Sequence, residues 1–365
     1  MAVICFVVYD LSIVGGVERV VESLANRLTE FYTIHILSLR GQSLNPALKL
    51  KDSIRIKSID ITEGRLRQQM LHAVPVLKKY FKDNHVEVAF LEATYAGFIG
   101  APLGVLSKTK IVFCDHGAIL NQINDNDITK MRRIAARFSN KVVVLTKKNK
   151  DDYEKCFRIK GNKVKCIYNW IAEETINPDT EYNFDSRVIL SAGRFTKEKG
   201  YDLLIEVAKK VMPVHSDWQW HIYGEGPLES SIRKLVKKEG LEEFVVFKGF
   251  VEQMEDVYKK AALYVLPSYR EGMPLVLLEA KAYKIPSVSF DIVTGPNEII
   301  SDEVNGCLIE PYDTAAMASC INWLIDNPEL RGLLSQNSYV DIENYREDSI
   351  LKQWISLINS LLKRK

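Results

Sequence analysis

The chain of 365 residues exceeds the roughly 100 to 200 residues of a typical single domain, which predicts two domains. With 47% hydrophobic and 26% charged residues it can fill two cores, and no apolar run approaches the ~20 residues of a membrane-spanning helix, which excludes an integral helical membrane protein. The net charge of +2 conceals an asymmetry, because residues 1–175 hold 27 Lys and Arg against 18 Asp and Glu, whereas the remainder holds 22 against 29. A basic N-terminal half indicates either an anionic partner or a solvated face without one.

The segment from Ala2 to Tyr9 is apolar but lacks a basic n-region and a cleavage site of small residues, and Asp10 interrupts it. It predicts a buried strand and not a signal peptide, so we expect a cytoplasmic protein. Short apolar runs then alternate with stretches of helical period, which is typical of parallel sheets covered by helices and predicts the α/β class. The predicted strands of the first half are Val3 to Val8, Thr33 to Leu39, Val86 to Leu91, Lys110 to Cys114 and Lys141 to Leu145.

The stretch from Glu63 to Asn84 is basic and has helical period, and Pro75 is expected to bend or divide the helix. Its apolar stripe fits either a helix that covers the sheet or one that lies on lipid. A second basic group in the same half adds to the positive field, so we expect the N-terminal domain to dock on an anionic membrane face. The stripe is Leu66, Met70, Leu71, Val74, Leu77 and Phe81; the expected membrane or acceptor face is Arg65, Arg67, Lys78, Lys79 and Lys82; the second group is Lys130, Arg132, Arg133, Arg137, Lys147, Lys148 and Lys150.

The second half repeats the α/β pattern after a segment, Trp170 to Phe184, that has neither period and contains turn residues. We therefore expect an N-terminal domain at 1–170, a linker at 171–186, a second domain at 187–340 and a C-terminal helix at 341–365 that crosses back to the first domain. The predicted strands of the second half are Val188 to Ala192, Gln219 to Tyr223, Val245 to Lys248, Leu263 to Leu266 and Ser287 to Phe290.

The six cysteines are scattered without C-x-x-C pairs, which argues against a zinc site and against a disulfide framework. We expect buried thiols. They are Cys5, Cys114, Cys156, Cys166, Cys307 and Cys320.

The strongest chemical signal is the string from Glu271 to Glu279, directly after a predicted strand. Gly272 and Pro274 suit a tight turn that opens a helix, so backbone amides near Met273 and Leu275 would bind an anion at the positive end of the helix dipole. Two carboxylates flanking such a site could hold sugar hydroxyls on one side and ribose hydroxyls on the other. Either glutamate alone fits an ordinary helix surface, whereas the whole string favours a functional site.

This string resembles the E-x7-E motif of glycosyltransferase family 4, and other motifs extend the resemblance across almost the whole chain. The resemblance implies the GT-B fold, in which two Rossmann-like domains with parallel sheets face each other across a central cleft. It also implies an acceptor-binding N-terminal domain and a donor-binding C-terminal domain, with a nucleotide-sugar donor that we expect to be UDP-linked.

Val188 to Gly200 is similar to the strand, Gly-Arg loop and Lys of this family, which implies that Arg194 and Lys199 contact the donor diphosphate. Two fixed cations would stabilise the charge that develops on the departing diphosphate. Within the E-x7-E string, we expect Glu271 to orient the sugar hydroxyls and Glu279 to hold the ribose.

Val14 to Glu18 resembles the glycine-rich loop of the family, where Gly15 and Gly16 would let the backbone approach the donor. Because the loop is not G-x-G-x-x-G, no nicotinamide cofactor is predicted. His116 matches the family position that contacts the donor sugar, although a lone loop histidine also fits a structural role.

Ile222 to Pro227 resembles the G-x-G-P turn of the family and assigns Gly224 to the donor site. Phe247 to Val251 resembles the strand end where backbone groups, here at Phe250 and Val251, meet the nucleobase. At the linker the family tends to carry I-x-N-G, whereas this chain has Trp170 at the glycine position, so the resemblance does not extend to the local turn there.

Phe290 to Ile300 resembles a loop frequent in bacterial surface-polysaccharide and lipid-linked-oligosaccharide transferases that use UDP-hexoses or UDP-N-acetylhexosamines. The expected activity is transfer of such a sugar, with retention of configuration, to a lipid-linked or lipopolysaccharide-type acceptor such as an O-antigen precursor. No D-x-D pattern follows a strand, so no metal is expected. The predicted location is the inner face of the plasma membrane, as a peripheral protein.

Two other functions remain open from the sequence. A nucleotide-sugar 2-epimerase of related fold would need no acceptor, and a sugar-binding protein would keep the fold without catalysis. The complete set of Arg194, Lys199, Glu271 and Glu279 argues against the second. Nucleic acid is not an expected partner, because the basic residues are not interleaved with an aromatic stacking motif.

Overall fold

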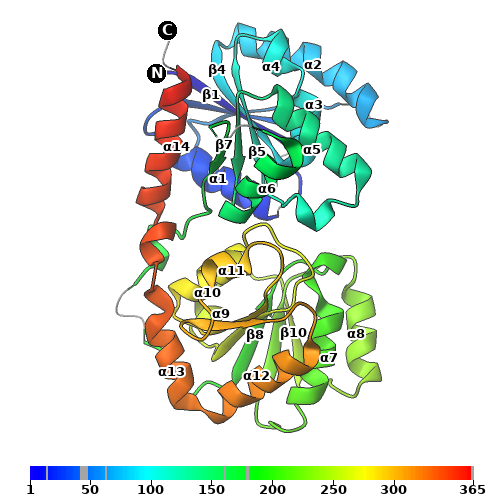
Figure 1. The fold of residues 1–365 in the computed structure, drawn as a ribbon, viewed down its shortest axis with the longest axis vertical. Coiled ribbons are helices and arrows are strands. Elements are labelled where there is room, and N and C mark those ends of the chain that lie inside the picture. The colour runs from blue at the N-terminus through cyan, green and yellow to red at the C-terminus, as the bar shows by residue number, and fades with distance from the viewer. Residues whose placement is uncertain (14, 42–47, 62–63, 160–161, 178–180, 363–365) are drawn as a thin grey trace. The chain divides into compact units, whose positions relative to one another are not determined.

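The computed structural model describes residues 1–13, 15–41, 48–61, 64–159, 162–177 and 181–362 of the chain. It divides into two compact units (Figure 1): unit 1 comprises Met1–Asn169 and Asp348–Lys365, and unit 2 comprises Trp170–Glu347. Five residues of the predicted loop, helix and linker lie outside the described residues, namely Val14, Glu63, Pro178, Asp179 and Thr180.

Unit 1 contains a parallel seven-stranded sheet in the order β3-β2-β1-β4-β5-β6-β7. The central strands are apolar and buried on both faces, as expected for a parallel sheet. The strands are β1 (Val3–Asp10), β2 (Thr33–Arg40), β3 (Arg55–Ser58), β4 (Val86–Glu92), β5 (Lys110–Asp115), β6 (Lys141–Val144) and β7 (Val164–Cys166).

The helices of unit 1 pack apolar stripes on this sheet, and α14 comes from the far end of the chain (Figure 1). Trp354 of α14 meets Phe90 of β4 edge-on, with ring centroids 5.5 Å apart, and Asn359 accepts a hydrogen bond from the Tyr32 hydroxyl. The helices are α1 (Gly16–Leu28), α2 (Leu66–Asp83), α3 (Ala93–Gly100), α4 (Leu103–Leu106), α5 (Asn126–Phe138), α6 (Lys147–Phe157) and α14 (Glu347–Leu362), with a 3-10 turn at Leu120–Gln122.

Unit 2 contains a parallel six-stranded sheet in the order β10-β9-β8-β11-β12-β13. Its strands are β8 (Val188–Ala192), β9 (Gln219–Tyr223), β10 (Val245–Gly249), β11 (Leu263–Leu266), β12 (Ser287–Phe290) and β13 (Gly306–Ile309). Its helices are α7 (Tyr201–Val211), α8 (Glu229–Lys238), α9 (Glu255–Tyr258), α10 (Leu275–Ala282), α11 (Pro296–Ile299), α12 (Thr314–Asp326) and α13 (Pro328–Gln336); 3-10 turns are η2 (Glu173–Thr175), η3 (Lys197–Lys199), η4 (Asn337–Tyr339) and η5 (Ile342–Tyr345).

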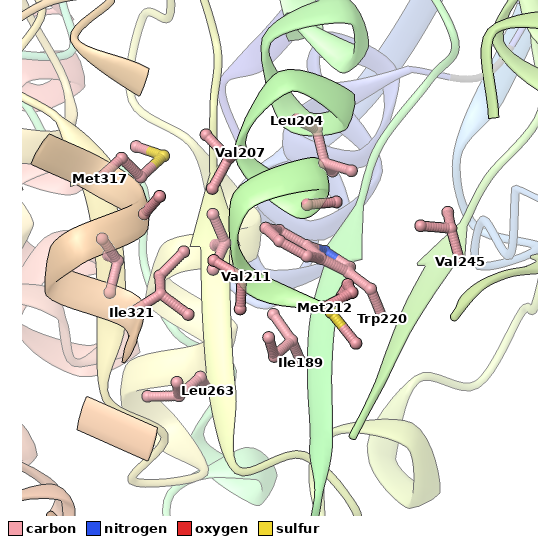
Figure 2. Packing of buried hydrophobic residues seen from close by; sticks show 14 of the residues in the cluster. Ile189, Leu204, Val207, Val211, Met212, Trp220, Val245, Leu263, Met317 and Ile321 are labelled. Atoms are coloured by element: carbon pink, nitrogen blue, oxygen red, sulfur yellow. The ribbon is translucent and has the colours of Figure 1, made fainter. Parts of the chain in front are cut away.

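Figure 2 shows the core of unit 2, where Trp220 of β9 lies beneath helix α7 among Leu204, Val211 and other apolar side chains. The buried indole is not left unsatisfied, because its Nε1 donates to the Ser191 hydroxyl at 3.0 Å. That hydroxyl in turn donates to the Val265 carbonyl at 2.7 Å. A polar chain therefore links three neighbouring strands and fixes the sheet that carries the loops described below.

Both sheets have the Rossmann strand order, so the α/β class and the two Rossmann-like domains of a GT-B fold are confirmed. In such sheets, successive strands are added first toward one edge and then toward the other, and this change occurs between two central strands. Ligands bind beyond the carboxyl ends of those two strands. Here this switch point lies between β1 and β4 in unit 1 and between β8 and β11 in unit 2.

All ten predicted strands are present, with ends shifted by at most two residues, but β3, β7 and β13 were not predicted. Pro75 was expected to bend or divide its helix, and division is wrong, because α2 is a single continuous helix with Pro75 inside it. The expectation of buried thiols holds for Cys5, Cys114 and Cys307, whereas Cys156 is exposed and the two others are half-buried. Within the described part of the chain, no helix has the length and hydropathy required to cross a membrane.

Candidate active site

In unit 2 the loops after β8 and β11 meet at the switch point. Gly200 ends η3 with a left-handed backbone, φ 64°, and a Cβ placed there would lie 2.0 Å from the Pro267 carbonyl oxygen. Only glycine therefore allows this contact between the loops. The Tyr269 amide also donates to the Glu198 carbonyl at 2.8 Å. The two loops are thus held together by their backbones.

This contact brings Lys199 to Glu271. The Lys199 Nζ lies 2.7 Å from Oε1 and 3.0 Å from Oε2 of Glu271, and the Ser268 hydroxyl donates to Oε1 at 2.7 Å. The Glu271 side chain is only 8% exposed and that of Lys199 26%. A partly buried, charge-assisted pair of this kind holds both groups in place before any ligand arrives.

The turn that carries Glu271 packs against the loop before α11. The Thr294 hydroxyl donates to the Glu271 carbonyl at 2.9 Å, and Gly295, with φ 101°, has no room for a side chain because a Cβ would lie 2.9 Å from the Gly272 carbonyl oxygen. Helix α10 then starts at Leu275, after Pro274, and no side chain caps this end. Its first turn thus keeps backbone amides that can donate to an anion.

Glu279 lies in the second turn of α10 and is bound by a tyrosine. The Tyr258 hydroxyl donates to Glu279 Oε2 at 2.6 Å, and the Tyr258 ring stacks on Tyr283 with centroids 5.3 Å apart and planes 9° from parallel. Burial raises the pKa of Tyr258 well above its ordinary value, so the hydroxyl keeps its proton and remains a donor. Tyr258 therefore positions the Glu279 carboxylate.

Arg194 follows β8 and is exposed, and among the described residues its guanidinium has no hydrogen-bond or ion-pair partner. The backbone around it is fixed on one side by Tyr201, whose hydroxyl donates to the Gly193 carbonyl at 2.9 Å. On the other side Gly224 is pressed against Gly193, since a Cβ at Gly224, where φ is 133°, would lie 2.1 Å from the Gly193 carbonyl oxygen. Arg194 is thus a free cation on an ordered loop.

The loops after β9 and β10 continue this arrangement. The Gly224 amide donates to the Gly249 carbonyl at 2.9 Å, and the Phe195 amide donates to the Glu225 carbonyl at 2.9 Å. Phe250 follows Gly249 directly and is 56% exposed, while Val251 is half-buried. The structure therefore brings the predicted donor residues of unit 2 onto connected loops at one end of the sheet.

In unit 1 His116 follows β5 and is paired with a glutamate. Its Nε2 lies 2.6 Å from Glu92 Oε2, with the two side chains 10% and 3% exposed. Glu92 ends β4, and the next residue, Ala93, has a left-handed φ of 62°. This conformation is strained for alanine, and strained residues of this kind cluster at functional sites. The His116 side chain is thus fixed by Glu92, and one of its ring nitrogens already has a partner.

The backbone that carries His116 is anchored by Asp115. This buried carboxylate pairs with Arg132 at 2.9 Å, accepts from the Tyr153 hydroxyl at 2.7 Å and accepts from the Gly117 amide at 3.1 Å. One cation of the predicted second basic group, Arg132, is therefore an internal ion pair and not part of a surface field.

The glycine-rich loop leads into α1. Gly15 is the N-cap residue, and its amide donates to Glu18 Oε2 at 2.9 Å. Burial raises the pKa of Glu18, and hydrogen bonds from the backbone, including that of the Gly15 amide, lower it in part. A side chain at Gly16 would meet nothing within 4 Å, so open space adjoins the start of α1.

The predicted membrane face lies on α2, and its five cations, Arg65, Arg67, Lys78, Lys79 and Lys82, are all exposed. The apolar stripe, however, faces the sheet: Leu77 and Phe81 are in the core and Leu66 and Val74 pack against it. Leu71 alone of the predicted stripe is exposed, at 69%. The alternative of a lipid-facing stripe is therefore wrong, and the surface of α2 is polar and basic.

Several residues of these sites were not predicted: Ser268, Tyr258 and Thr294 in unit 2, and Glu92 in unit 1. Hydroxyl groups and single carboxylates far away in sequence carry no spacing signal of their own. Among the described residues no group of three or more His, Cys, Asp and Glu side chains is arranged to hold a metal ion.

Two family models match the chain. The model described as Glycosyl transferases group 1 matches residues 172–341, which include the whole Arg194 to Glu279 site, and the model described as Glycosyltransferase Family 4 matches residues 14–175. The chain belongs to these glycosyltransferase families.

Individual relatives of this glycosyltransferase act in the synthesis of bacterial glycans, by their names. It is 26% identical over 352 residues to the amylovoran biosynthesis glycosyltransferase AmsD of Erwinia amylovora, covering 94% of this chain and 96% of the relative. It is 24% identical over 375 residues, 98% of each chain, to an alpha-1,4-N-acetyl-D-galactosaminyltransferase of Campylobacter jejuni named for a PP-undecaprenol-linked glycan. A crystal structure of S. aureus TarM with UDP matches with a TM-score of 0.84 at 20% identity, covering 98% of this chain and 100% of that one.

Proposed function

We propose that this glycosyltransferase moves a hexose or an N-acetylhexosamine from a UDP-sugar to a lipid-linked or lipopolysaccharide-type glycan, with retention of configuration, in bacterial surface-polysaccharide synthesis. The Lys199–Glu271 pair carries the proposal, because a cation and a carboxylate lie 2.7 Å apart beyond the carboxyl ends of β8 and β11. A diphosphate needs the first group and sugar hydroxyls need the second. The names of the C. jejuni and E. amylovora relatives, and the UDP in the TarM structure, support the acceptor and donor classes.

The donor is proposed to bind to unit 2 with each part on a different loop. Arg194, Lys199 and the first turn of α10, from Gly272 to Leu275, bind the diphosphate. Glu279 accepts hydrogen bonds from the ribose, and Glu271 accepts them from the transferred sugar. Gly224 and the backbone at Phe250 and Val251 contact the nucleoside. In unit 1, Gly15, Gly16 and His116 are proposed to approach the diphosphate and the sugar.

The proposed chemical step is a front-face substitution. The oxygen of the acceptor hydroxyl forms a bond to the anomeric carbon on the side of the departing UDP, and the bond from that carbon to the diphosphate oxygen breaks with its electron pair on the diphosphate. The same diphosphate oxygen takes the acceptor proton. The protein contributes by holding the developing negative charge between Arg194 and Lys199. We propose that these cations make a divalent metal unnecessary.

A radiolabelled panel of nucleotide sugars, incubated with the protein and a lipid extract of its host, tests the function. We expect a UDP-hexose or UDP-N-acetylhexosamine to label the lipid fraction, and we expect the rate to be the same with excess EDTA. The matched control is Arg194→Ala, which should slow the labelling of the lipid fraction about 100-fold or more. Conversion of the nucleotide sugar without lipid extract would instead identify an epimerase, and loss of labelling in EDTA that manganese restores would contradict the metal-free mechanism.

The acceptor is proposed to lie at an anionic membrane, with the exposed cations of α2 facing the lipid headgroups at the inner face of the plasma membrane. Each Lys or Arg near such a surface contributes about 1 kcal/mol of attraction. Because the apolar stripe of α2, apart from Leu71, packs into unit 1, the proposed attraction is electrostatic and reversible. The partner of Lys79, Asp83 at 2.7 Å, reduces the contribution of that lysine.

Sedimentation with liposomes tests this surface. We expect the protein to sediment with anionic liposomes at low salt and less at high salt, because charges are screened within roughly 8 Å at physiological ionic strength. Changing Lys78, Lys79 and Lys82 together to Glu should release it. Changing Lys234, Lys237 and Lys238 of α8, which are also exposed, to Glu is the charge-matched control and should not. Equal sedimentation of the two triple variants would argue against α2 as the membrane face.

A further inference from the structure

A second basic site lies in unit 1 between α2 and the edge of the sheet. It is a groove of about 540 Å³ lined by the last turns of α2 and by β2 and β3, and it is separate from the loops that hold His116 and Gly15. Its volume is within the range of small-molecule sites, about 300 to 1,000 Å³. Strand β3 forms the edge of the sheet and pairs with β2 alone.

The charge of this groove is positive. Arg55 and Lys57 alternate on β3 and therefore point to the same face, toward α2. Lys79 of α2 adds a third cation, and the single carboxylate among the lining residues, Asp83, is bound to Lys79 at 2.7 Å. Among the residues that the structure describes, neither Arg55 nor Lys57 has a carboxylate partner. The groove thus has two uncompensated cations.

Both cations are held in position by neutral groups. The Arg55 guanidinium donates to Asn84 Oδ1 at 2.8 Å, and the Lys57 Nζ lies 5.6 Å from the centroid of the Tyr80 ring. Tyr80 is itself fixed, because its hydroxyl lies 3.0 Å from Nδ1 of His35, a side chain of β2 that is 4% exposed. Burial and the charge of Arg55 lower the pKa of His35, which favours its neutral form. His35 therefore adds no positive charge to the groove.

We propose that this groove binds a phosphate group. A planar guanidinium and a nearby ammonium are the pair that phosphate oxygens require, since arginine can donate two parallel hydrogen bonds and lysine supplies a point charge. Asn84 and Tyr80 orient the cations and do not neutralise them, which leaves their charge for an anion. The phosphate belongs either to a soluble phosphorylated molecule or to a phospholipid headgroup. The site is independent of the proposed sugar transfer.

Two probes distinguish these sources: glycerol 3-phosphate, measured by calorimetry, and phosphatidylglycerol vesicles, measured by sedimentation. The test variant is Arg55→Ala with Lys57→Ala, and the matched control is Lys108→Ala with Lys110→Ala, two exposed lysines of unit 1 outside the groove. We expect the affinity of the test variant for the relevant probe to fall at least about tenfold, as for the loss of a charge-assisted hydrogen bond. The control variant should bind with the affinity of the wild type. An effect on glycerol 3-phosphate alone assigns a soluble ligand, and an effect on vesicles assigns a headgroup.

Two results would overturn the proposal. One is equal binding of both probes by the test variant and its control, which would show that the groove has no specific role. The other is glycerol 3-phosphate binding that disappears in Arg194→Ala and persists in the test variant, because the phosphate would then occupy the donor site of unit 2. The thermal midpoint of each variant should match wild type, since all four substituted side chains are exposed. A conservative pair, Arg55→Lys with Lys57→Arg, should restore most of the binding if the charge is what matters.

Discussion

Replacing Arg194 by alanine is expected to lower kcat about 100-fold or more, the size of the effect when one group that stabilises a transition-state charge is removed. The side chain is exposed and has no partner among the described residues, so its loss should change the thermal midpoint little. The fold should not depend on this side chain, because Tyr201 and Gly224 fix the backbone of the loop through Gly193 and not through the arginine side chain. Steady-state kinetics with the best donor, together with a thermal melt, measure both quantities.

Lys199→Ala should reduce kcat to a similar extent, but it acts through two losses. It removes a cation from the diphosphate, and it removes the ammonium group that holds both oxygens of the Glu271 carboxylate. Because residues in one hydrogen-bonded unit do not act additively, the double variant Lys199→Ala, Glu271→Ala should be little worse than either single variant. By contrast, Arg194→Ala combined with Glu271→Ala should show the product of the two single effects.

The conservative variant Arg194→Lys provides a control, since it keeps the charge but not the planar fork, and it should recover part of the lost rate. A wild-type kcat in Arg194→Ala or Lys199→Ala would remove that residue from the diphosphate site. A large fall in the thermal midpoint of Arg194→Ala would show instead that the arginine supports the fold.

The sequence predicted the strands that are buried on both faces, because such strands are continuous β-branched runs. The three strands it missed, β3, β7 and β13, are all at sheet edges and have only three or four residues. Edge strands are often short and charged, which discourages pairing with other chains, as Arg55 and Lys57 do in β3 and Lys165 does in β7. Strand β13 is uncharged, but its four residues are too few to show a strand pattern without the neighbouring strand.

The residues of the candidate site were predicted from sequence motifs. A motif does not show which residues of different motifs contact each other in the folded protein. Lys199 and Glu271 are separated by 72 positions, and their pairing depends on Gly200, whose small size lets the loop after β8 touch the loop after β11. Tyr258 is similar: a tyrosine before a strand is ordinary in sequence, and its importance comes from the Glu279 carboxylate that the fold places on it.

Removing Glu279 should chiefly weaken nucleotide binding. If its carboxylate holds the ribose, Glu279→Ala loses charge-assisted hydrogen bonds, and we expect the affinity for the nucleoside diphosphate to fall about tenfold to a hundredfold. Tyr258→Phe should produce a smaller loss, because the ring still stacks on Tyr283 while the carboxylate loses the donor that orients it. Calorimetry with UDP measures both, and unchanged affinity in Glu279→Ala would contradict the ribose assignment.

Glu271→Ala should have the opposite profile, with turnover reduced at least 100-fold and UDP affinity retained or increased. UDP lacks the sugar that Glu271 is proposed to orient, so the substitution removes no contact with it. The substitution also releases Lys199, which is paired with Glu271 at 2.7 Å in the structure, and an unpaired ammonium next to the diphosphate binds it more strongly. Ser268→Ala is the milder test, since it removes a donor to Glu271 without freeing the lysine and should reduce turnover with no gain in UDP affinity. A collapse of UDP affinity in Glu271→Ala would mean that this glutamate binds the nucleotide, and it would contradict the proposed division of roles between Glu271 and Glu279.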